Sequence, residues 1–278
     1  MAITAQDVNK LRQLTGAGMM DCKKALTEAD GDFDKAIEIL RKQGQKVAAK
    51  RADNTVSEGV VLVRISDNGS NGKLVALACE TEPVANVADF KSLAQVILDE
   101  AVAGNHSDVE SLSSAKLADG STVAERIVDL TGKLGEKIEI VGYENLDAEK
   151  VVPYIHSNGK LGVLVAFEGA GDTDLDVVGK DIAMQIAAMR PVALDKEGVD
   201  AALVEREIEI GKEQARAEGK PEAMLERIAQ GKLQKFYKDN TLLNQEFVKD
   251  SSLTIRQLLE RTAKGLSIKT FKRVGIGS

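Results

Sequence analysis

The feature that most restricts the fold of this chain is an internal repeat. The sequence SNGKLVALA at residues 70–78 returns as SNGKLGVLVA at residues 157–166, 87 residues later. Each copy follows a run rich in β-branched residues. Each also precedes a stretch with helical apolar spacing, over 90–102 in the first case and 179–189 in the second. This order predicts two related α+β halves that pack together, each with an antiparallel hairpin sheet.

The remaining segments complete these halves and add one further element. Residues 60–65 and 74–79 are typical of paired strands, 123–134 of a helix and 137–141 of another strand. After Pro191 a narrow heptad-like apolar seam runs through two charged stretches, which Gly219-Lys220-Pro221 separates. We expect a projecting antiparallel helical (coiled-coil) hairpin here. A helix near 254–259 and a strand over 267–274 then close the chain.

The first 44 residues predict a compact bundle of three short helices. Thr4 and Asp7 have the spacing of a capping box, and Gly16 and Gly18 mark a short turn between the first two helices. The apolar positions expected to face the shared core are Val8, Leu11, and Leu14 or Thr15 in the first helix; Met19, Cys22, Leu26 and Ala29 in the second; and Phe33, Ala36, Ile37 and Leu40 in the third.

One apolar side chain of this bundle is left over. Met20 lies about 100° around the helix from the apolar stripe, so the core cannot easily take it. Lys23 and Lys24 follow one turn later. The alternatives are a solvated helix with a single exposed Met, or an adaptable face for docking a protein.

Composition limits the class of protein. A hydrophobic fraction of 43%, with no Trp and 3% aromatic residues, indicates a globular chain with an aliphatic core. No apolar run approaches the ~20 residues that span a membrane, and no basic-then-apolar leader opens the chain, so we expect no membrane partner and a cytoplasmic location. Cys22 and Cys79 lie in apolar patterns, which favours buried thiols over a disulfide.

Charge narrows the choice of partner. A net charge of −7 argues against nucleic acid as the main partner. The charge is uneven, because residues 1–51 hold ten Lys and Arg against seven Asp and Glu, whereas the rest holds 27 against 37. A mildly basic head on an acidic body suits docking to an acidic protein surface.

The sequence offers no grouping typical of an active site. His106 and His156 are the two histidines, and no Cys, His and carboxylate cluster has the spacing of metal ligands. No GxSxG, GxxxxGK[ST] or strand-following GxGxxG motif occurs. We therefore expect a binding protein without catalytic residues, bound metal or cofactor.

A family resemblance gives the binding hypothesis a specific form. The stretch LRQLTGAGMMDCKKALTEADGDFDKAIEILRKQG at residues 11–44 resembles the N-terminal ubiquitin-associated-like (UBA-like) module of bacterial elongation factor Ts. The resemblance extends over nearly the whole chain. It implies a guanine-nucleotide exchange factor for elongation factor Tu in translation elongation, which binds the GDP-bound and nucleotide-free partner.

The resemblance also implies a division of the chain. We expect a UBA-like three-helix domain at 1–47, a linker at 48–58 and a first α+β subdomain at 59–142. The second α+β subdomain would comprise 143–190 and 238–278, with the helical hairpin inserted at 191–237. Family members often continue with a further helix. This sequence ends at Ser278, so we expect that contact to be missing.

In the family, a TDFVA segment after a strand enters the partner's GTPase domain and disturbs its Mg²⁺ and phosphate loop. The matching residues are Thr81, Glu82, Pro83, Val84 and Ala85, which follow the strand expected to end at Cys79. Glu82 keeps the carboxylate, but Pro83 replaces the family's Phe. A Pro also suits the first turn of a helix capped by Thr81, so a purely structural role for this segment stays open.

Other family contacts fall on further residues of this chain. Leu134 and Gly135 match a second contact with the GTPase domain, and His156 and Gly159, in a YxH segment that starts at Tyr154, match a contact with the partner's third domain. In the bundle, the residues expected to touch the partner are Met19, Met20 and Lys23.

Two other functions remain as alternatives. One is a UBA-type interaction scaffold that binds a partner without changing nucleotide release. The other is a hydrolase that uses His156 with a nearby acid. The sequence also leaves open whether the chain forms a homodimer.

Overall fold

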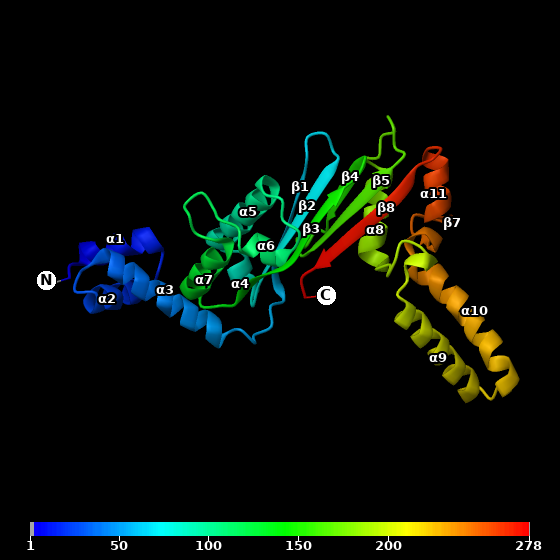
Figure 1. Ribbon diagram of the computed structural model, residues 1–278, viewed down its shortest axis with the longest axis horizontal. Coiled ribbons are helices and arrows are strands. Elements are labelled where there is room, and N and C mark those ends of the chain that lie inside the picture. Colours follow the sequence, from blue (N-terminus) through cyan, green and yellow to red (C-terminus); the bar gives the residue numbers. More distant parts are fainter. Residues whose placement is uncertain (1–2, 278) are drawn as a thin grey trace.

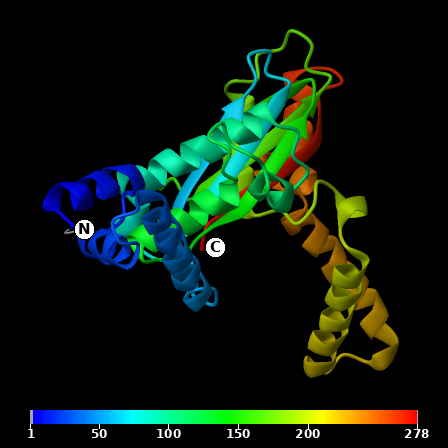
Figure 2. The same cartoon turned by 60° about the vertical axis from the view of Figure 1, so that its left-hand side comes forward.

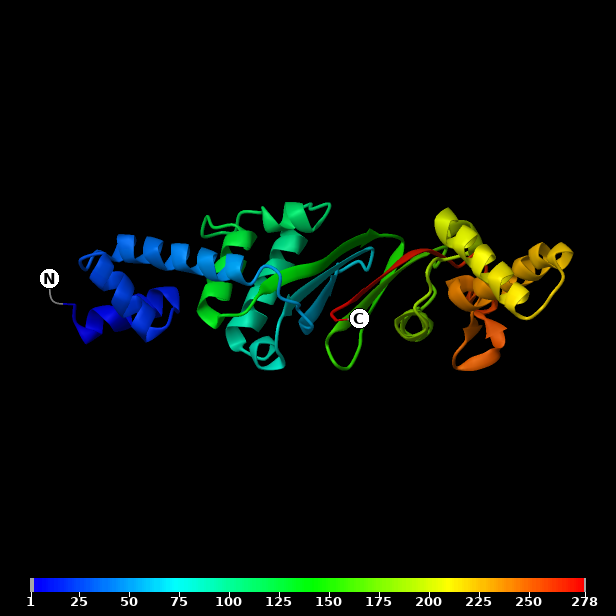
Figure 3. The same cartoon turned by 90° about the horizontal axis from the view of Figure 1, so that it is seen from below.

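A computed structural model describes residues 3–277 and confirms the α+β class. The parts lie roughly in a row (Figure 1): the N-terminal helices at one end, two small antiparallel sheets in the middle and a long helical hairpin at the other end. Viewed from below, the same order is visible, with the hairpin well separated from the bundle (Figure 3). The expectation about the chain end falls on Ser278, outside the described residues.

The N-terminal bundle has the three predicted helices, α1 (Ala5–Thr15), α2 (Met19–Glu28) and α3 (Phe33–Lys50). Thr4 and Asp7 form the expected capping box, and Gly16 ends α1 in the left-handed conformation at φ +68°. Asp32 caps α3 through the backbone N–H groups of its first turn. The core is formed mainly by Val8, Leu11, Cys22, Ala25, Leu26, Ala29 and Ala36.

One expectation for the bundle is wrong. Met19 was expected in the core, but its side chain is 57% exposed, and Ala25 fills the face of α2 instead. Of the two alternatives at the end of α1, Thr15 is the half-buried residue, whereas Leu14 is 63% exposed. The Thr15 hydroxyl donates to the Leu11 carbonyl oxygen at 2.8 Å. The third helix also runs through the expected start of the linker and ends at Lys50. The Ala and Lys residues from 46 to 50 are good helix formers, and no Gly or Pro interrupts them.

The first half contains a three-stranded sheet in the order β1-β2-β3, with all neighbours antiparallel. Its elements are β1 (Glu58–Ile65), β2 (Asn71–Cys79), α4 (Glu82–Ala85), α5 (Ala88–Ala103), α6 (Val109–Ser113), α7 (Val123–Leu134) and β3 (Ile138–Asp147). The last strand is longer than the expected 137–141, because it pairs along the whole of β2. The short helix α6 had no recognisable periodicity in the sequence.

The second half repeats this plan in the order β4-β5-β8. Its elements are β4 (Lys150–Ile155), β5 (Leu161–Glu168), α8 (Val178–Met189), α11 (Ile255–Thr262) and β8 (Ser267–Gly275). A small two-stranded sheet, β6 (Glu246–Phe247) and β7 (Asp250–Thr254), was not expected and precedes α11. The helical hairpin therefore lies between α8 and α11.

The two sheets pack against each other, and the helices cover their outer faces (Figure 1). On β2, alternate residues face opposite ways: Val75, Leu77 and Cys79 join the helix-covered core, whereas Leu74, Ala76 and Ala78 face the other sheet. On β5, Val163 and Val165 face α8, whereas Leu164 and Ala166 face the first sheet. Both central strands are buried on both faces, which explains their continuous apolar runs.

The internal repeat is real, but its structural offset is 90 residues instead of 87. The tight turns at Gly69 and Gly159 are equivalent, with φ of +74° and +70°. In each turn the glycine N–H donates to a carbonyl oxygen at 2.8 Å, that of Ser66 in the first and that of His156 in the second. The register of the sheet shifts after Ala76 in one half and after Ala166 in the other. The identical letters SNGK mislead, because the turn glycine Gly69 precedes the motif in the first half, whereas the turn glycine Gly159 is the third residue of the motif in the second half.

The helical hairpin consists of α9 (Ala201–Ala217) and α10 (Glu222–Asn240), and Figure 2 shows it extending away from the sheets. Its narrow seam is as predicted: Ala215, Leu225, Ala229 and Leu233 are buried. The two helices approach closely at Gly211, where an added Cβ would lie 3.1 Å from the Ala229 Cα. Short 3-10 turns, Lys196–Gly198 and Leu242–Asn244, flank the hairpin.

Candidate partner-binding surface

Residues 81–85, here named the TEPVA segment, form an exposed turn and a short helix at the end of the first sheet. Glu82 and Pro83 are exposed, Val84 is half-buried, and Ala85 is 8% exposed within the first core. Ala85 therefore anchors the segment, while Glu82 and Pro83 face solvent. Glu82 makes no ion pair with any residue between 3 and 277, so its carboxylate is available.

Thr81 precedes α4 but does not cap it with its side chain. Its hydroxyl instead donates to a carboxylate oxygen of Glu136 at 2.7 Å, and its backbone N–H donates to the other oxygen at 3.0 Å. The expected side-chain cap is therefore wrong, since the Thr81 hydroxyl bonds Glu136 and accepts no N–H from α4. Glu136 directly follows Gly135, so this contact brings the TEPVA segment next to the predicted second contact at Leu134 and Gly135.

Glu80 directly precedes the TEPVA segment and fixes the start of this turn. Its carboxylate accepts from the Lys137 backbone N–H at 2.6 Å, from the Arg51 guanidinium at 2.9 and 3.0 Å, and from the Asn54 amide at 3.0 Å. The Lys137 N–H, with help from Arg51 and Asn54, keeps the pKa of Glu80 below its usual value. This carboxylate joins the end of α3, the end of β2 and the start of β3.

Leu134 and Gly135 form the end of α7. Leu134 packs against the first core, and Gly135 caps the helix in the left-handed conformation at φ +73°, with its N–H donating to the Thr131 carbonyl oxygen at 2.8 Å. The space beside Gly135 is open, since an added Cβ would meet no atom within 4 Å. The turn is thus accessible, and Glu136 fixes it beside Thr81.

Cys79 lies directly under this site but is not a reactive group. Its buried thiol donates to the Thr81 carbonyl oxygen, with 3.3 Å between the sulfur and the oxygen. Burial, and next the nearby Glu136 carboxylate, raise the pKa of the thiol to about 11. The thiol is therefore protonated at neutral pH and serves as part of the core. Cys22 and Cys79 are both free and buried, as predicted.

The bundle presents an exposed apolar patch formed by Leu14, Met19 and Met20. Their side chains are 63%, 57% and 62% exposed, and Lys23 is exposed one turn further along α2. The sequence left open whether Leu14 or Thr15 faces the core. Choosing Thr15 would have left Leu14 on the surface, next to Met19 and Met20. Three large apolar side chains around one turn are typical of a protein-docking face.

The position of this patch relative to the sheets depends on a close helix crossing. At Gly132 of α7, an added Cβ would lie 2.6 Å from the Gly44 Cα of α3. Because that neighbour is backbone, it cannot move aside like a flexible side chain. The two glycines therefore let α3 and α7 approach closely, and this contact sets the direction in which the bundle points.

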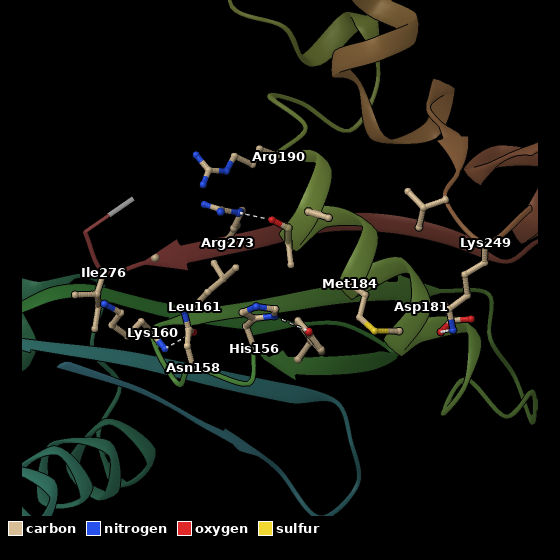
Figure 4. Close-up of a pocket in the computed structure, with 15 residues that line it drawn as sticks. His156, Asn158, Lys160, Leu161, Asp181, Met184, Arg190, Lys249, Arg273 and Ile276 are labelled. Carbon is tan, nitrogen blue, oxygen red and sulfur yellow. Dashed lines mark hydrogen bonds and ion pairs between the residues drawn. The ribbon is translucent and has the colours of Figure 1, made fainter. Parts of the chain in front are cut away.

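His156 and Gly159 lie in the turn between β4 and β5. The Tyr154 hydroxyl and the His156 Nδ1 atom are 2.9 Å apart, and both side chains line a cavity of about 560 Å³ (Figure 4). Gly159 adopts φ +70°, and its carbonyl oxygen accepts from the Val61 N–H at 2.8 Å. His156 therefore lines a cavity, whereas Gly159 forms the turn and its hydrogen bond with Val61 links the two halves.

The sequence reasoning missed Glu80 and Glu136, the two carboxylates that fix the TEPVA segment. Each stands next to a residue that was singled out, Thr81 and Gly135, but a charged residue at the end of a strand carries no signal of its own partner. Within residues 3–277 no group of three His, Cys, Asp or Glu side chains is arranged to hold a metal ion. No helix in this part of the chain is long and apolar enough to cross a membrane.

Known proteins are similar to this chain over almost its whole length. The family model described as elongation factor TS matches residues 80–278. The chain is 65% identical over 274 residues to the elongation factor Ts of Cytophaga hutchinsonii, with 99% of each chain covered. It is also similar to those of Amoebophilus asiaticus, 57% identical with both chains fully covered, and Porphyromonas gingivalis, 50% identical with 98% of each chain covered. The chain therefore belongs to the elongation factor Ts family, the nucleotide exchange factors that act on elongation factor Tu in translation elongation.

Proposed function

We propose that the chain contacts elongation factor Tu at three places and opens the partner's nucleotide site with the TEPVA segment. The observation that carries this proposal is the exposed, unpaired Glu82 on a turn that two other carboxylates hold in place. A turn that is fixed before binding loses little conformational freedom on insertion. The chain itself carries out no covalent chemistry, and it acts in the cytoplasm.

In this proposal Glu82 acts on the Mg²⁺ of the partner. The family resemblance implies that the segment enters beside the partner's Mg²⁺ and phosphate loop. Mg²⁺ requires nearly ideal octahedral geometry, so a small displacement of its ligands weakens its binding. Since the metal ion bridges nucleotide phosphate oxygens and protein, its loss weakens the binding of GDP. Pro83 gives the segment a rigid backbone in place of the apolar area that the family's Phe would supply.

The other proposed contacts hold the partner while this happens. The bundle, 1–47, would bind the GTPase domain through Met19, Met20 and Lys23, with Leu14 completing the apolar patch. The first subdomain, 59–142, would add Leu134 and Gly135 beside the TEPVA segment. The second, 143–190 and 238–278, would contact the third domain through His156, and the hairpin at 191–237 projects from it. Residues 48–58 join the bundle to the first sheet.

Thermodynamic linkage fixes the behaviour of such a factor. If the chain lowers the affinity of the partner for GDP, GDP must lower the affinity of the partner for the chain by the same factor. The ternary complex is therefore short-lived. It resolves either to the partner with GDP or to the partner with the exchange factor.

A fluorescent-GDP release assay tests the proposal. Elongation factor Tu loaded with a fluorescent GDP analogue is mixed with excess unlabelled GDP and increasing concentrations of this protein. We expect the release rate to rise and then saturate. Stable binding with an unchanged release rate would support the scaffold function instead.

A further inference from the structure

The cavity beside Tyr154 and His156 is lined by more positively charged side chains than form ion pairs with carboxylates. Its charged lining residues are Lys160, Asp181, Arg190, Lys249 and Arg273. Lys160 pairs with Glu58 at 3.0 Å, and Lys249 pairs with Asp181 at 2.7 Å. Within residues 3–277, Arg190 and Arg273 make no ion pair with a carboxylate. The two arginines therefore leave a net positive charge at one end of the cavity.

The two guanidinium groups are close enough to repel each other. Arg273 lies on β8 and donates through Nε to the Ala187 carbonyl oxygen at 3.4 Å, while Arg190 follows the end of α8 (Figure 4). Burial and next the charge of Arg190 keep the pKa of Arg273 below its usual value. Two cations held together without an intervening anion are unfavourable, and an oxyanion between them would relieve the repulsion.

The backbone at Arg190 is unusual in a way that favours a functional site. Arg190 has φ +48°, and the described part of the chain contains one other non-glycine residue with positive φ, Asp30. A left-handed conformation is unfavourable for a long side chain, and Gly is the usual residue at this position after a helix. The fold therefore keeps an arginine at a helix end where glycine is the usual residue, and its guanidinium lies near that of Arg273 (Figure 4).

Apart from Tyr154, His156 and Asn158, the uncharged side chains that line the cavity are apolar. Leu161, Met184, Ala187 and Ile276 line it, so it offers an apolar surface next to the two charged groups. Such a site matches an acidic side chain on an otherwise apolar protein segment, because the guanidinium groups bind the carboxylate and the apolar wall packs against its surroundings. A free phosphate ion would use the charge but not the apolar wall.

We propose that Arg190 and Arg273 bind an Asp or Glu side chain of elongation factor Tu in this cavity, beside His156. The inference rests on the proposed function, because it extends the contact that His156 makes with the partner's third domain. The pair contributes to affinity and not to the opening of the nucleotide site, since the TEPVA segment lies in the other half.

The first test compares the concentration dependence of GDP release. In R190A and R273Q we expect the half-saturating concentration to rise on the order of tenfold, with the maximal release rate unchanged. The loss should shrink at high salt, because the contact is charged. K180A is the matched control, since Lys180 is exposed on the same helix, does not line the cavity, and should behave like the wild type.

The outcomes separate this inference from the proposed function. If the wild type does not accelerate GDP release, the proposed function fails. If the wild type accelerates release and both arginine variants match K180A, the proposed function stands and the arginine site is refuted.

A second test identifies the bound group without relying on rates. R273K keeps the positive charge and supplies an amine that a carbodiimide couples to a carboxylate in direct contact. Mass spectrometry of the complex with elongation factor Tu should show a cross-link from position 273 to an Asp or Glu of the partner. A cross-link only to a carboxylate of this chain itself, or none from position 273, would contradict the proposal.

Discussion

Gly72 of β2 and Gly162 of β5 occupy equivalent places in the two halves, and each is covered by the other half. An added Cβ at Gly72 would lie 2.6 Å from Val151, and one at Gly162 would lie 2.6 Å from Val61. The two valines are themselves equivalent, since both pairs are separated by 90 positions. The contact is therefore reciprocal, like that of a symmetric dimer, but within one chain.

The backbone follows the same symmetry. The Val61 N–H donates to the Gly159 carbonyl oxygen at 2.8 Å, and the Val151 N–H donates to the Gly69 carbonyl oxygen at 2.8 Å. Each half thus uses its first strand to bind the turn of the other. This arrangement holds the two halves in one relative position, which matters for a protein that contacts a partner with both.

The first prediction concerns this interface. G72A and G162A should each lower the free energy of unfolding by about 1–3 kcal/mol, because the added methyl group overpacks the space between the sheets. Urea denaturation measures the change. G231A serves as the control: Gly231 lies inside α10 with open space around it, so its replacement should stabilise by about 0.5–1 kcal/mol. Wild-type stability for both G72A and G162A would contradict the packing described.

The second prediction concerns Glu80, whose side chain is 17% exposed. E80Q should lower the free energy of unfolding by about 1–3 kcal/mol at pH 7, because it removes the charge that Arg51 and the Lys137 N–H bind. The pKa of Glu80 is lower in the folded state, so its contribution is complete above the unfolded pKa near 4.3 and is lost as pH falls through the folded value.

The measurement is urea denaturation of both proteins between pH 7 and pH 3. The difference between wild type and E80Q should shrink as the pH falls below about 4. E218Q is the control, because Glu218 makes an exposed 3.8 Å pair with Lys232 on the hairpin and should contribute little. A difference that does not change with pH would contradict the network at Glu80.

The third prediction concerns the helix crossing at Gly44 and Gly132. G132A should push α3 away from α7 and turn the apolar patch from its position, because the added methyl group meets backbone at 2.6 Å. The half-saturating concentration in the GDP release assay should rise several-fold, roughly the effect of losing 1 kcal/mol of contact. Small-angle X-ray scattering should show a changed profile. An unchanged profile and an unchanged half-saturating concentration would mean that this crossing does not position the bundle.

The fourth prediction concerns Pro83. P83F should increase the rate of GDP release from a partner whose groove accepts an aromatic side chain, because Phe buries more apolar area, at roughly 25 cal/mol per Å². The release assay with elongation factor Tu measures it, with P83A as the control for loss of the rigid ring. No change, or slower release, with P83F would show that this position does not insert into the partner.

Much of the fold could be predicted from local sequence signals. The helix predicted at 123–134 has these bounds in the structure, where Thr122 caps its start and Gly135 ends it. The strands of both hairpins were found from their β-branched runs and turn glycines. The true repeat offset could not be predicted, because the sequence does not show that Gly69 and Gly159 are the equivalent turn glycines. The length of β3 was hidden too, because only pairing along β2 determines it.

The candidate site was less visible in the sequence. The resemblance placed the TEPVA segment, but it could not show that Thr81 turns from α4 to Glu136, 55 positions away. It could not show that Arg190 and Arg273 meet, because the hairpin and α11 separate them in the chain. Such pairs are formed by tertiary packing, and local periodicity carries no information about them.

The most direct test of the central claim is the GDP release assay with wild type and E82A, run once with Mg²⁺ and once with EDTA. If Glu82 acts by displacing the partner's Mg²⁺, E82A should release GDP on the order of tenfold more slowly than the wild type in Mg²⁺. The two proteins should become equal once EDTA has removed the metal. Equal rates in Mg²⁺, or the same defect of E82A in both conditions, would contradict the account.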